Sequence, residues 1–379
     1  MNKKLIFFGG TFDPPHIEHV NLLKNAVEEI APDKVIVMPT YSPPHKKTFL
    51  SATPTRRLKL CKIAFSGIKG VEVSDWEIKQ KGKSFSYLTM QKLAKEYSGY
   101  QIYFLMGTDM VSSFHTWKNP TEILKLATPL LCERLGEGVS AQKSKRDFYE
   151  RFGVQIPTLK YVGKRQSSTD IKIKKLLKMD VSDCLTDGVN RLIDEFSLYN
   201  GGFMADYVVK NLTPKRIEHT KGVIALALKY AKKLGVCLNR TLTASLLHDV
   251  AKYLNPADFP NFEMPDGVPA PVVHQYLGAH VAKTVLGVKC NQVLNAIRYH
   301  TSAKPDMSLL AKIVFTADML EEGRTYEGVD EMRKISFENF DEGFALSLKR
   351  SLTYINLRGG EIYPLTQKAY DYYKHLIKE

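Results

Sequence analysis

Residues 5–20 decide the fold of the first half of the chain, and they read Leu5-Ile6-Phe7-Phe8-Gly9-Gly10-Thr11-Phe12-Asp13-Pro14-Pro15-His16-Ile17-Glu18-His19-Val20. Four apolar residues predict a buried parallel strand, and a glycine pair and two prolines separate it from an amphipathic run. Glycines let backbone N–H groups approach an anion, and the following helix directs the positive end of its dipole to the same point. We therefore predict a phosphate-binding turn with His16 and His19 on one face of the helix.

Short apolar segments alternate with helical ones through the rest of the first half. Residues 35–38, 71–73, 102–106, 130–132 and 159–162 are strand candidates, and residues 55–65 and 87–97 have helical periodicity. This alternation predicts an α/β fold with a doubly wound parallel sheet. Because ligands of such sheets bind beyond the carboxyl ends of the strands, the loops that follow strands are the candidate sites.

Several of these loops carry residues suited to phosphate. Pro43-Pro44-His45-Lys46 follows the second strand and can hold a lysine rigidly, and Gly107-Thr108-Asp109 follows the fourth. Ser167-Ser168-Thr169 with Lys172 forms a phosphate cradle if a helix begins there, although this motif taken alone favours ordinary helix capping.

Together these motifs resemble the (H/T)xGH nucleotidyltransferase signature, in wording closest to the bacterial nicotinate mononucleotide adenylyltransferases. The resemblance implies transfer of an adenylyl group from ATP to nicotinate mononucleotide, with Mg²⁺ carried on the phosphates. We expect His16, His19 and Lys46 to be catalytic. The resemblance places Phe85, Ser86 and Trp117 at the pyridine nucleotide, and it gives as residues that line the ATP site Gly9, Gly10, Thr11, Phe12, Asp13, Gly107, Asp109, Ser167, Ser168, Thr169 and Lys172.

Four positions depart from the family pattern. Glu18 replaces a glycine, and on a helix its carboxylate should point away from the triphosphate. Lys172 replaces an arginine, which keeps the charge but loses the bidentate fork. Phe85 and Ser86 replace the usual Tyr and Thr, which leaves nicotinamide mononucleotide, or another acceptor such as phosphopantetheine, as an alternative substrate.

The pattern changes after Asn200-Gly201-Gly202, a helix stop and linker. We therefore place an adenylyltransferase-like domain at residues 1–200 and an all-α domain at residues 201–379. Thr213-Pro214 predicts a helix that runs to Leu234, and the next helix is expected over residues 242–253.

The helical half contains an ordered series of potential metal ligands: His219, His248, Asp249, His274, His280, His300 and Asp318. An adjacent His and Asp flanked by apolar residues are costly to bury unless something coordinates them. Any one of these histidines alone, His280 above all, is more often structural than a ligand.

The segments 216–220, 246–252, 296–301 and 317–324 resemble the bacterial HD-type symmetrical diadenosine tetraphosphate hydrolases, and the similarity covers about residues 206–358. It implies that His219, His248, Asp249 and Asp318 hold an iron ion, although the same ligands suit Mn, Zn or Co. It also places His274, His300, Thr301 and Arg324 around the nucleotide phosphates. Lys252, one turn after His248, can share the anionic load. The alternative is an idle HD module that senses a nucleotide and regulates the first half.

Composition limits the other possibilities. At 379 residues the chain is long enough for two or three domains. A net charge of +14 suits polyanionic substrates, but we find no aromatic-interleaved basic motif for nucleic acid. The five cysteines form no CxxC pair, and no apolar segment suits a membrane span or signal peptide. We expect a cytoplasmic enzyme of small nucleotides, and leave homo-oligomer formation open.

Overall fold

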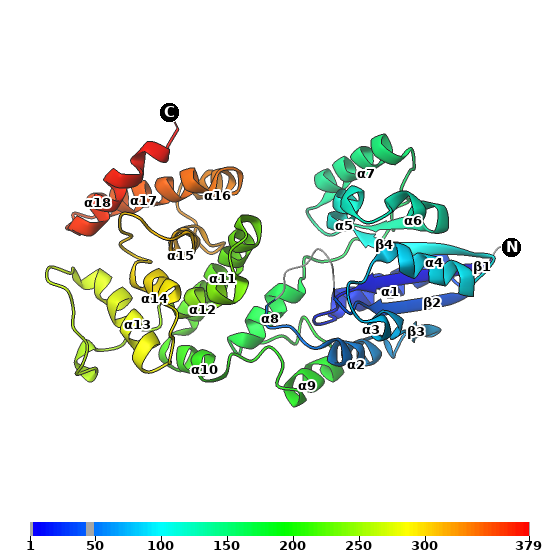
Figure 1. The fold of residues 1–379 in the computed structure, drawn as a ribbon, viewed down its shortest axis with the longest axis horizontal. Coiled ribbons are helices and arrows are strands. Elements are labelled where there is room, and N and C mark those ends of the chain that lie inside the picture. The colour runs from blue at the N-terminus through cyan, green and yellow to red at the C-terminus, as the bar shows by residue number, and fades with distance from the viewer. Residues whose placement is uncertain (1–2, 43–48, 379) are drawn as a thin grey trace. The chain divides into compact units, whose positions relative to one another are not determined.

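A computed structural model describes residues 3–42 and 49–378 (Figure 1). These residues form two compact units. The first contains residues 3–42, 51–172 and 180–199, and the second contains residues 49–50, 173–179 and 200–378. No helix in the described ranges is long and apolar enough to cross a membrane.

The first unit is built on a parallel sheet of five strands in the order β3-β2-β1-β4-β5. The strands are β1 (Lys3–Gly10), β2 (Lys34–Pro39), β3 (Val71–Val73), β4 (Tyr100–Gly107) and β5 (Thr128–Cys132). The expected strand at residues 159–162 is wrong: only isolated bridges at Thr158 and Gly163 pair with the chain beside β5. Pro157, which has no N–H, can only accept a bond there, from the Leu131 N–H.

Helices cover both faces of this sheet, which confirms the predicted doubly wound fold. Phe7 packs on one face in a cluster with Met90 of α4 and Phe148 of α7, and Phe8 on the other face contacts Phe65 of α2. The helices of this unit are α1 (Ile17–Ile30), α2 (Pro54–Phe65), α3 (Trp76–Gln80), α4 (Ser86–Glu96), α5 (Thr108–Ser113), η1 (Phe114–Thr116), α6 (Pro120–Leu126), α7 (Gly138–Phe152), α8 (Ser168–Leu176) and α9 (Asp187–Glu195).

The second unit is helical and has its own core. Its elements are α10 (Gly202–Asn211), α11 (Pro214–Leu234), α12 (Leu238–Leu247), η2 (Pro256–Asp258), η3 (Ala270–Val272), α13 (Val273–Thr284), α14 (Asn291–Arg298), α15 (Leu309–Leu320), α16 (Val329–Glu338), α17 (Phe340–Leu357), α18 (Pro364–Tyr373) and η4 (Lys374–Leu376). α11 has the predicted bounds, and the Thr213 side chain caps it by accepting from the Arg216 N–H.

The helix expected at residues 242–253 begins earlier and ends earlier, at Leu238 and Leu247. Beyond it the chain continues in tight turns, because the Val250 N–H bonds to the Leu247 carbonyl and the Lys252 N–H bonds to the Asp249 carbonyl. His248 and Asp249 therefore lie at the helix end, where the chain curls into the core.

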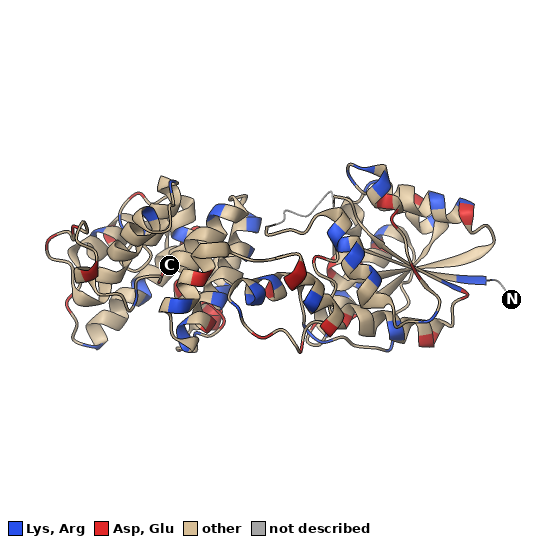
Figure 2. Cartoon of the chain, turned by 90° about the horizontal axis from the view of Figure 1, so that it is seen from below, with Lys and Arg blue, Asp and Glu red and all other residues tan. Residues whose placement is uncertain are grey.

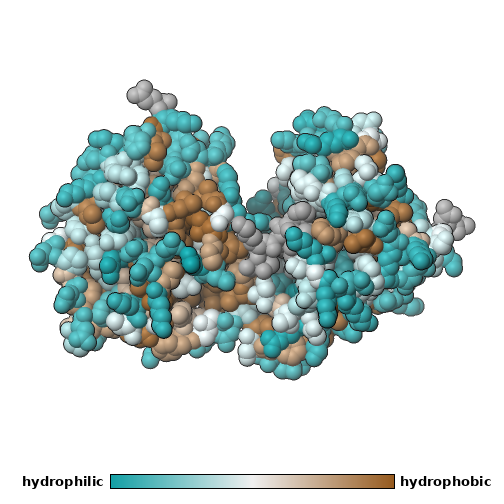
Figure 3. All heavy atoms as spheres, in the orientation of Figure 1, coloured by the Kyte–Doolittle hydropathy of each residue, from teal (hydrophilic) through white to brown (hydrophobic). Residues whose placement is uncertain are grey.

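Charged residues of both signs are interspersed on the helices of each unit (Figure 2). On the face drawn in Figure 3, most surface atoms are hydrophilic and hydrophobic atoms gather in smaller patches. The basic excess of the chain is thus spread over many helices.

Candidate active sites

The turn after β1 brings its two histidines together. His16 precedes α1 as its N-cap residue and is buried, while His19 lies in the first turn. Their rings stack with centroids 3.6 Å apart. The His16 backbone N–H donates to His19 Nδ1 at 3.1 Å, so a neutral His19 carries its proton on Nε2. That proton suits donation to a phosphate oxygen.

The glycines of this turn have no space for a side chain. A Cβ at Gly9 would come 2.8 Å from the Phe7 ring, and one at Gly10 would come 3.0 Å from the Phe12 ring. Phe12 itself is buried with a φ of +48°, the left-handed region that non-glycine residues rarely adopt. The backbone path between Gly10 and Asp13 is therefore closely specified by packing.

Asp13 and Lys172, both expected at the nucleotide, are paired with each other in the protein interior. The Lys172 ammonium lies 3.2 Å from Asp13 Oδ2. Asp13 Oδ1 accepts from the Tyr199 hydroxyl at 2.8 Å and from the Ala52 N–H at 3.0 Å. These contacts tie α8 and the end of the unit to the signature turn, and direct contact of either side chain with phosphate stays a prediction.

The start of α8 is also joined to this turn. The Ser168 hydroxyl donates to the Pro14 carbonyl at 2.9 Å. Ser167 Oγ accepts from the Asp170 N–H at 3.1 Å, the capping contact named above as the alternative to phosphate binding. Thr169 lies half-buried in the first turn of α8. The Ser168 hydroxyl thus bonds to the turn that follows β1, whereas that of Ser167 caps its own helix.

Glu18 uses its carboxylate to hold the segment before α8. Its Oε2 accepts from the Tyr161 hydroxyl at 2.9 Å and from the Lys164 N–H at 2.7 Å. Its Oε1 accepts from the Asn21 side chain at 3.2 Å. Glu18, which replaces the glycine of the signature, is therefore buried and joins α1 to residues 161–164 by hydrogen bonds.

Arg57 on α2 is a site residue that the sequence did not reveal. Its guanidinium is buried and donates to the carbonyls of Thr11, Thr40 and Tyr41 at 2.7, 2.6 and 2.9 Å. It joins the loop after β1 to the loop after β2. The neighbouring Arg56 and Lys59 are equally basic, so no feature of the pattern marks Arg57 as the buried cation.

Of the residues expected at the pyridine ring, Phe85 and Ser86 lie at the start of α4, and the residue after Trp117 contacts Phe85. Trp117 packs on Phe104 and Phe114 with centroids 6.0 and 5.2 Å apart. The ammonium of Lys118, the next residue, lies 4.9 Å from the Phe85 ring centroid. Phe85 is the N-cap residue of α4, and Ser86 begins that helix. Lys118 was not anticipated, because an exposed lysine in a loop is common.

The remaining expected residues of the first unit are placed as follows. Gly107 ends β4, and a Cβ there would lie 2.9 Å from Asp109 Oδ1 in the first turn of α5. Thr11 lies half-buried in the turn after β1. Lys46 and the loop around it lie outside the described residues, so its catalytic role stays a prediction.

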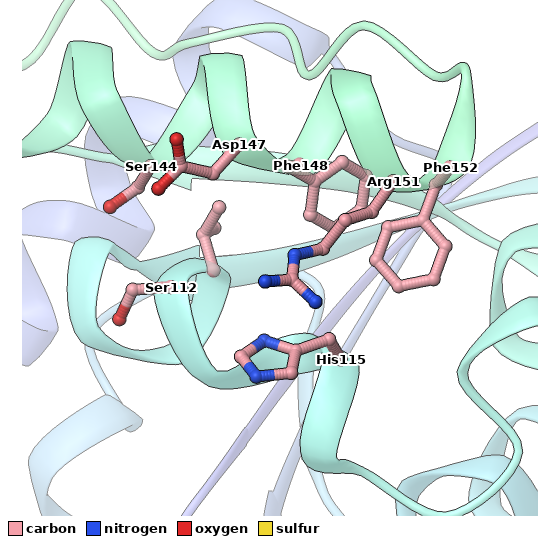
Figure 4. Close-up of a pocket in the computed structure, with 8 residues that line it drawn as sticks. Ser112, His115, Ser144, Asp147, Phe148, Arg151 and Phe152 are labelled. Atoms are coloured by element: carbon pink, nitrogen blue, oxygen red, sulfur yellow. The ribbon is translucent and has the colours of Figure 1, made fainter.

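A small hollow between α5, η1 and α7 is separate from these residues. Its volume is about 10 Å³, room for about one water molecule. The Arg151 guanidinium and the His115 imidazole point toward each other across it, beside Ser112 and Ser144 (Figure 4). None of the side chains lining it belongs to the expected site.

The second unit gathers imidazoles and carboxylates from five helices into two groups of three. One contains His219 of α11, His248 after α12 and Asp318 of α15, and the other contains Asp249, His274 of α13 and His300 after α14. Within each group one ligand atom per residue lies within 4.8 Å of the others. This differs from the expectation for His274 and His300, which form a potential metal site with Asp249 instead of only surrounding phosphates.

Asp249 lies between the two groups and offers one oxygen to each. Oδ1 is 3.1 Å from His274 Nε2 and 3.5 Å from His300 Nε2. Oδ2 is 3.4 Å from His248 Nε2 and 3.9 Å from His219 Nε2. The carboxylate therefore contacts potential metal ligands of both groups.

Three of the imidazoles are oriented through their other nitrogen. His248 Nδ1 donates to the Ser245 carbonyl at 2.7 Å, and His300 Nδ1 donates to the Ile297 carbonyl at 2.8 Å. His219 Nδ1 pairs with Glu321 Oε1 at 3.1 Å. Contacts of this kind fix the tautomer that presents Nε2 to a metal. Glu321 lies within the segment 317–324, and its spacing of three from Asp318 is the sequence signal that could have indicated it.

Burial and neighbouring charges shift the protonation equilibria of both groups. Burial opposes the change, but hydrogen bonds to Asp318 and Glu321 raise the pKa of His219, so a metal ion at its Nε2 would displace a proton. Burial lowers the pKa of His274 to about 4, so its imidazole is neutral at pH 7. Burial alone would raise the pKa of Asp318, but the hydrogen bond from His219 and the charge of Arg324 hold it well below the usual range. The pKa of buried Asp249 is likewise held low, by His248, His274 and His300.

Cations and a hydroxyl surround the two groups. Arg216 Nη1 lies 2.8 Å from Asp249 Oδ2, and Arg324 Nη2 lies 2.8 Å from Asp318 Oδ1. Lys252 Nζ lies 3.2 Å from His274 Nε2. Thr301 Oγ1 lies 3.2 and 3.0 Å from the Nε2 atoms of His274 and His300. The arrangement suits a polyphosphate.

His280 belongs to neither group, because its ring packs on Phe262 at 5.5 Å. The remaining set of imidazole nitrogens and carboxylate oxygens fits a divalent transition metal in its donor chemistry. No thiolate takes part in either group of the described residues.

Comparison with known proteins assigns each half. Residues 7–173 match the cytidylyltransferase-like family and residues 216–323 match the HD domain, a domain that implies divalent metal dependence. The chain is 29% identical over 362 residues, 92% of its length, to 98% of a Mycoplasma genitalium protein named probable nicotinate-nucleotide adenylyltransferase/Ap4A hydrolase.

Two further relatives each match one half. A Clostridium perfringens protein named probable nicotinate-nucleotide adenylyltransferase is 32% identical over 52% of this chain and 98% of its own. A Bacillus subtilis protein named bis(5′-nucleosyl)-tetraphosphatase, symmetrical, is 30% identical over 44% of this chain and 92% of its own. The chain therefore belongs, through its first half, to the nicotinate-nucleotide adenylyltransferase family and, through its second, to the HD-domain symmetrical bis(5′-nucleosyl)-tetraphosphatases.

Proposed function

We propose that the chain is a bifunctional enzyme of nucleotide metabolism. The first unit transfers the adenylyl group of ATP to nicotinate mononucleotide, which gives deamido-NAD and pyrophosphate. The second unit uses one water molecule to hydrolyse diadenosine tetraphosphate to two ADP. The fused Mycoplasma relative, matched over most of both chains, supports the pairing of the two activities.

Adenylyl transfer needs positioning and charge stabilisation, with no covalent intermediate. The 5′-phosphate of the acceptor attacks the α-phosphorus of ATP in line while pyrophosphate leaves. His19 Nε2–H and the adjacent His16 offer donors at the glycine turn, and Lys46 is proposed to assist them. Mg²⁺ enters with ATP, held by its phosphates.

The residues expected at the pyridine ring support nicotinate mononucleotide as the acceptor. Trp117 offers an aromatic face beside the start of α4. Lys118 holds its ammonium over Phe85 in the same region, and a cation there favours the carboxylate that nicotinate has and nicotinamide lacks. Pyrophosphate release compared across nicotinate and nicotinamide mononucleotide and phosphopantetheine tests this choice, and equal rates would contradict it.

The hydrolase proposal rests on the position of Asp249 between two groups of Nε2 atoms. His219, His248 and Asp318 would hold one divalent ion and His274 and His300 a second, with Asp249 shared. Such ions polarise a phosphoryl oxygen and make water a stronger nucleophile. Arg216, Lys252 and Arg324 offset the charge of the phosphate chain, and attack on a phosphorus of the central bridge releases ADP on both sides. Iron is the proposed metal.

Two histidine substitutions, each with a matched control, test the whole assignment. His19→Ala should lower adenylyl transfer by about 100-fold or more and leave diadenosine tetraphosphate hydrolysis intact. His248→Ala should remove metal and hydrolysis and leave transfer intact. The controls are His115→Ala in the first unit and His280→Ala in the second, which lie outside the ligand and signature sets and should change neither reaction.

Metal analysis and product identification on these proteins decide the remaining alternatives. Elemental analysis of the wild-type chain identifies the ion, and two equivalents per chain are expected. A second unit that binds nucleotide without metal or ADP release would contradict the hydrolase and support a regulatory sensor.

A further inference from the structure

Tyr199 ends the first unit and reaches back to the turn after β1. It is only 3% exposed, and its hydroxyl donates to Asp13 Oδ1 at 2.8 Å. The backbone around it is sharply bent, because Ser197 has a φ of +50° and Tyr199 one of +57°. Residues other than glycine rarely adopt this left-handed region, and they keep it only where the surrounding structure holds them there. The contact with Asp13 is such a restraint.

The Tyr199 hydroxyl serves Asp13 as a hydrogen-bond donor. Burial, the negative charge of Asp13 and the hydrogen bond between them raise the pKa of Tyr199 far above its usual value, so the phenol keeps its proton. Asp13 is itself only 4% exposed. Its Oδ1 also accepts from the Ala52 N–H at 3.0 Å, and its Oδ2 lies 3.2 Å from the Lys172 ammonium. Because a buried carboxylate is costly without such partners, these contacts together specify where it lies.

The position of Asp13 is passed on to the histidine pair of the signature. Only two prolines separate Asp13 from His16. A proline ring fixes φ, so the chain between the two residues has few torsions through which it could adjust. His16 is the N-cap residue of α1, and its ring stacks on that of His19 with centroids 3.6 Å apart. A shift of the Asp13 carboxylate would therefore move both imidazoles.

We propose that Tyr199 is a positioning residue for adenylyl transfer, which holds His16 and His19 in place through Asp13. The inference rests on the proposed transferase activity and adds a residue that lies outside the expected site. Tyr199 is buried and its hydroxyl is engaged by Asp13, so it acts on the imidazoles and not on the substrate. Misplacing reacting groups by about 1 Å costs about 100-fold in rate. Tyr199 supplies one of three contacts to Asp13, so the loss of its hydroxyl should cost about tenfold.

Tyr199→Phe tests the proposal, because it removes the hydroxyl and keeps the ring, whose centroid lies 6.0 Å from the Lys172 ammonium. The kcat of adenylyl transfer should fall about tenfold. The KM values for ATP and nicotinate mononucleotide should change by less than about twofold, since a contact that orients the reacting groups acts in the transition state. Hydrolysis of diadenosine tetraphosphate should not change. Tryptophan fluorescence shows that the first unit is folded, since Trp76 and Trp117 both lie in it.

The matched control is Tyr161→Phe, which loses the same kind of bond in the same unit. The Tyr161 hydroxyl donates to Glu18 Oε2 at 2.9 Å, and that oxygen also holds the Lys164 N–H. Both variants should lose a similar amount of stability, but kcat should fall only in Tyr199→Phe. An equal fall in both variants would overturn the proposal, because the hydroxyl would then contribute only to stability. A normal kcat in Tyr199→Phe, with or without a raised KM, would also overturn it.

Histidine NMR gives a readout that does not depend on turnover. In the full chain with isotope-labelled histidine, the side-chain signals of His16 and His19 should shift in Tyr199→Phe and shift far less in Tyr161→Phe. The signals of His115 and His280 should stay in place in both. Unchanged His16 and His19 signals in Tyr199→Phe would overturn the proposal. Shifted signals in a chain whose wild type transfers no adenylyl group would sustain the positioning and contradict the proposed reaction, so the two failures are distinguishable.

Discussion

Glu18 shows how a single departure from a family signature acquires a structural task. Its buried carboxylate accepts three hydrogen bonds, from Tyr161, the Lys164 backbone and Asn21. A glycine at this position would leave the Tyr161 hydroxyl and the Lys164 N–H without these partners.

We expect Glu18→Gly to lower the free energy of unfolding of the first unit by about 1–3 kcal/mol, because buried groups lose their acceptor. Glu18→Gln should cost less, since its amide oxygen can still accept one of these bonds. The two tryptophans of the chain, Trp76 and Trp117, both lie in the first unit. Tryptophan fluorescence during denaturation therefore reports that unit alone.

The matching control for Glu18 is Glu28→Gln, an exposed carboxylate on the same helix. It should leave the fluorescence transition unchanged. Equal stability of Glu18→Gly and the wild-type chain would show that water replaces the carboxylate and that its hydrogen bonds contribute nothing.

At the scale of single residues, the sequence indicated which residues belong to the sites better than it indicated their hydrogen-bond partners. The spacing of His16 and His19 and the series from His219 to Asp318 marked candidates because such residues are costly to bury singly. Arg57 could not be assigned, because the neighbouring Arg56 and Lys59 are chemically similar and only the tertiary fold selects one. Glu321 has a weak signal in its spacing of three from Asp318, but the adjacent Glu322 is chemically identical.

Among the secondary-structure elements, α2 positions the site through one side chain. The Arg57 guanidinium bonds to carbonyls in the loops after β1 and β2. Burial lowers the pKa of Arg57, although Asp13 opposes that effect. A lysine has one nitrogen on a flexible stem and cannot serve several carbonyls in this geometry.

Arg57→Lys should therefore destabilise the first unit by about 2–4 kcal/mol and lower adenylyl transfer more than it lowers hydrolysis. Fluorescence denaturation and the two activity assays measure these effects. Arg56→Lys on the same helix is the control and should be close to wild type, since Arg56 is exposed. Normal stability of Arg57→Lys would mean that the loops after β1 and β2 keep their conformation without the guanidinium.

The bounds of the elements were predictable where a cap or a stop residue is present. Thr213-Pro214 set the start of α11. The end of α12 was not predictable, because Leu246, Leu247, Val250 and Ala251 continue a helical apolar pattern past the point where the hydrogen bonds tighten into turns. The segment 159–162 is apolar like a strand but pairs only at isolated bridges, which periodicity does not reveal.

On the scale of the whole molecule, the two units have separate cores. We therefore expect metal binding to change the stability of the second unit and not that of the first. An ion that binds only the folded second unit stabilises that unit by about 2.7 kcal/mol at 100 times its dissociation constant. Chelation of the metal should thus lower the midpoint of an unfolding transition of helices followed by circular dichroism. The midpoint of the transition followed by tryptophan fluorescence should not change.

The control is addition of Mg²⁺ and ATP, which should raise the tryptophan transition instead. If chelation moves both transitions together, the two units unfold as one cooperative unit.

The five cysteines divide by burial across the chain. Cys61, Cys132 and Cys184 are buried, Cys237 is exposed and Cys290 is partly exposed. Burial raises the pKa of Cys61 far above its usual value and that of Cys132 to about 12. At pH 8 a thiol reagent should label Cys237 first and Cys290 more slowly, and should reach the others only on unfolding. Peptide mapping of the labelled chain checks the order, and early labelling of Cys61 would contradict it.

The helix α8 is divided between the two units, with its start in the first and its end in the second. This division bears on how the two activities can be separated. The first residues of α8, through Lys172, hold the signature turn, whereas Ile173, Leu176 and Leu177 are buried in the core of the second unit. A gene cut after Tyr199 would leave those three side chains in a fragment that lacks their partners, and the other fragment with a hole. Each separated half should therefore be less stable than in the whole chain, so each activity is better removed by point substitution than by truncation.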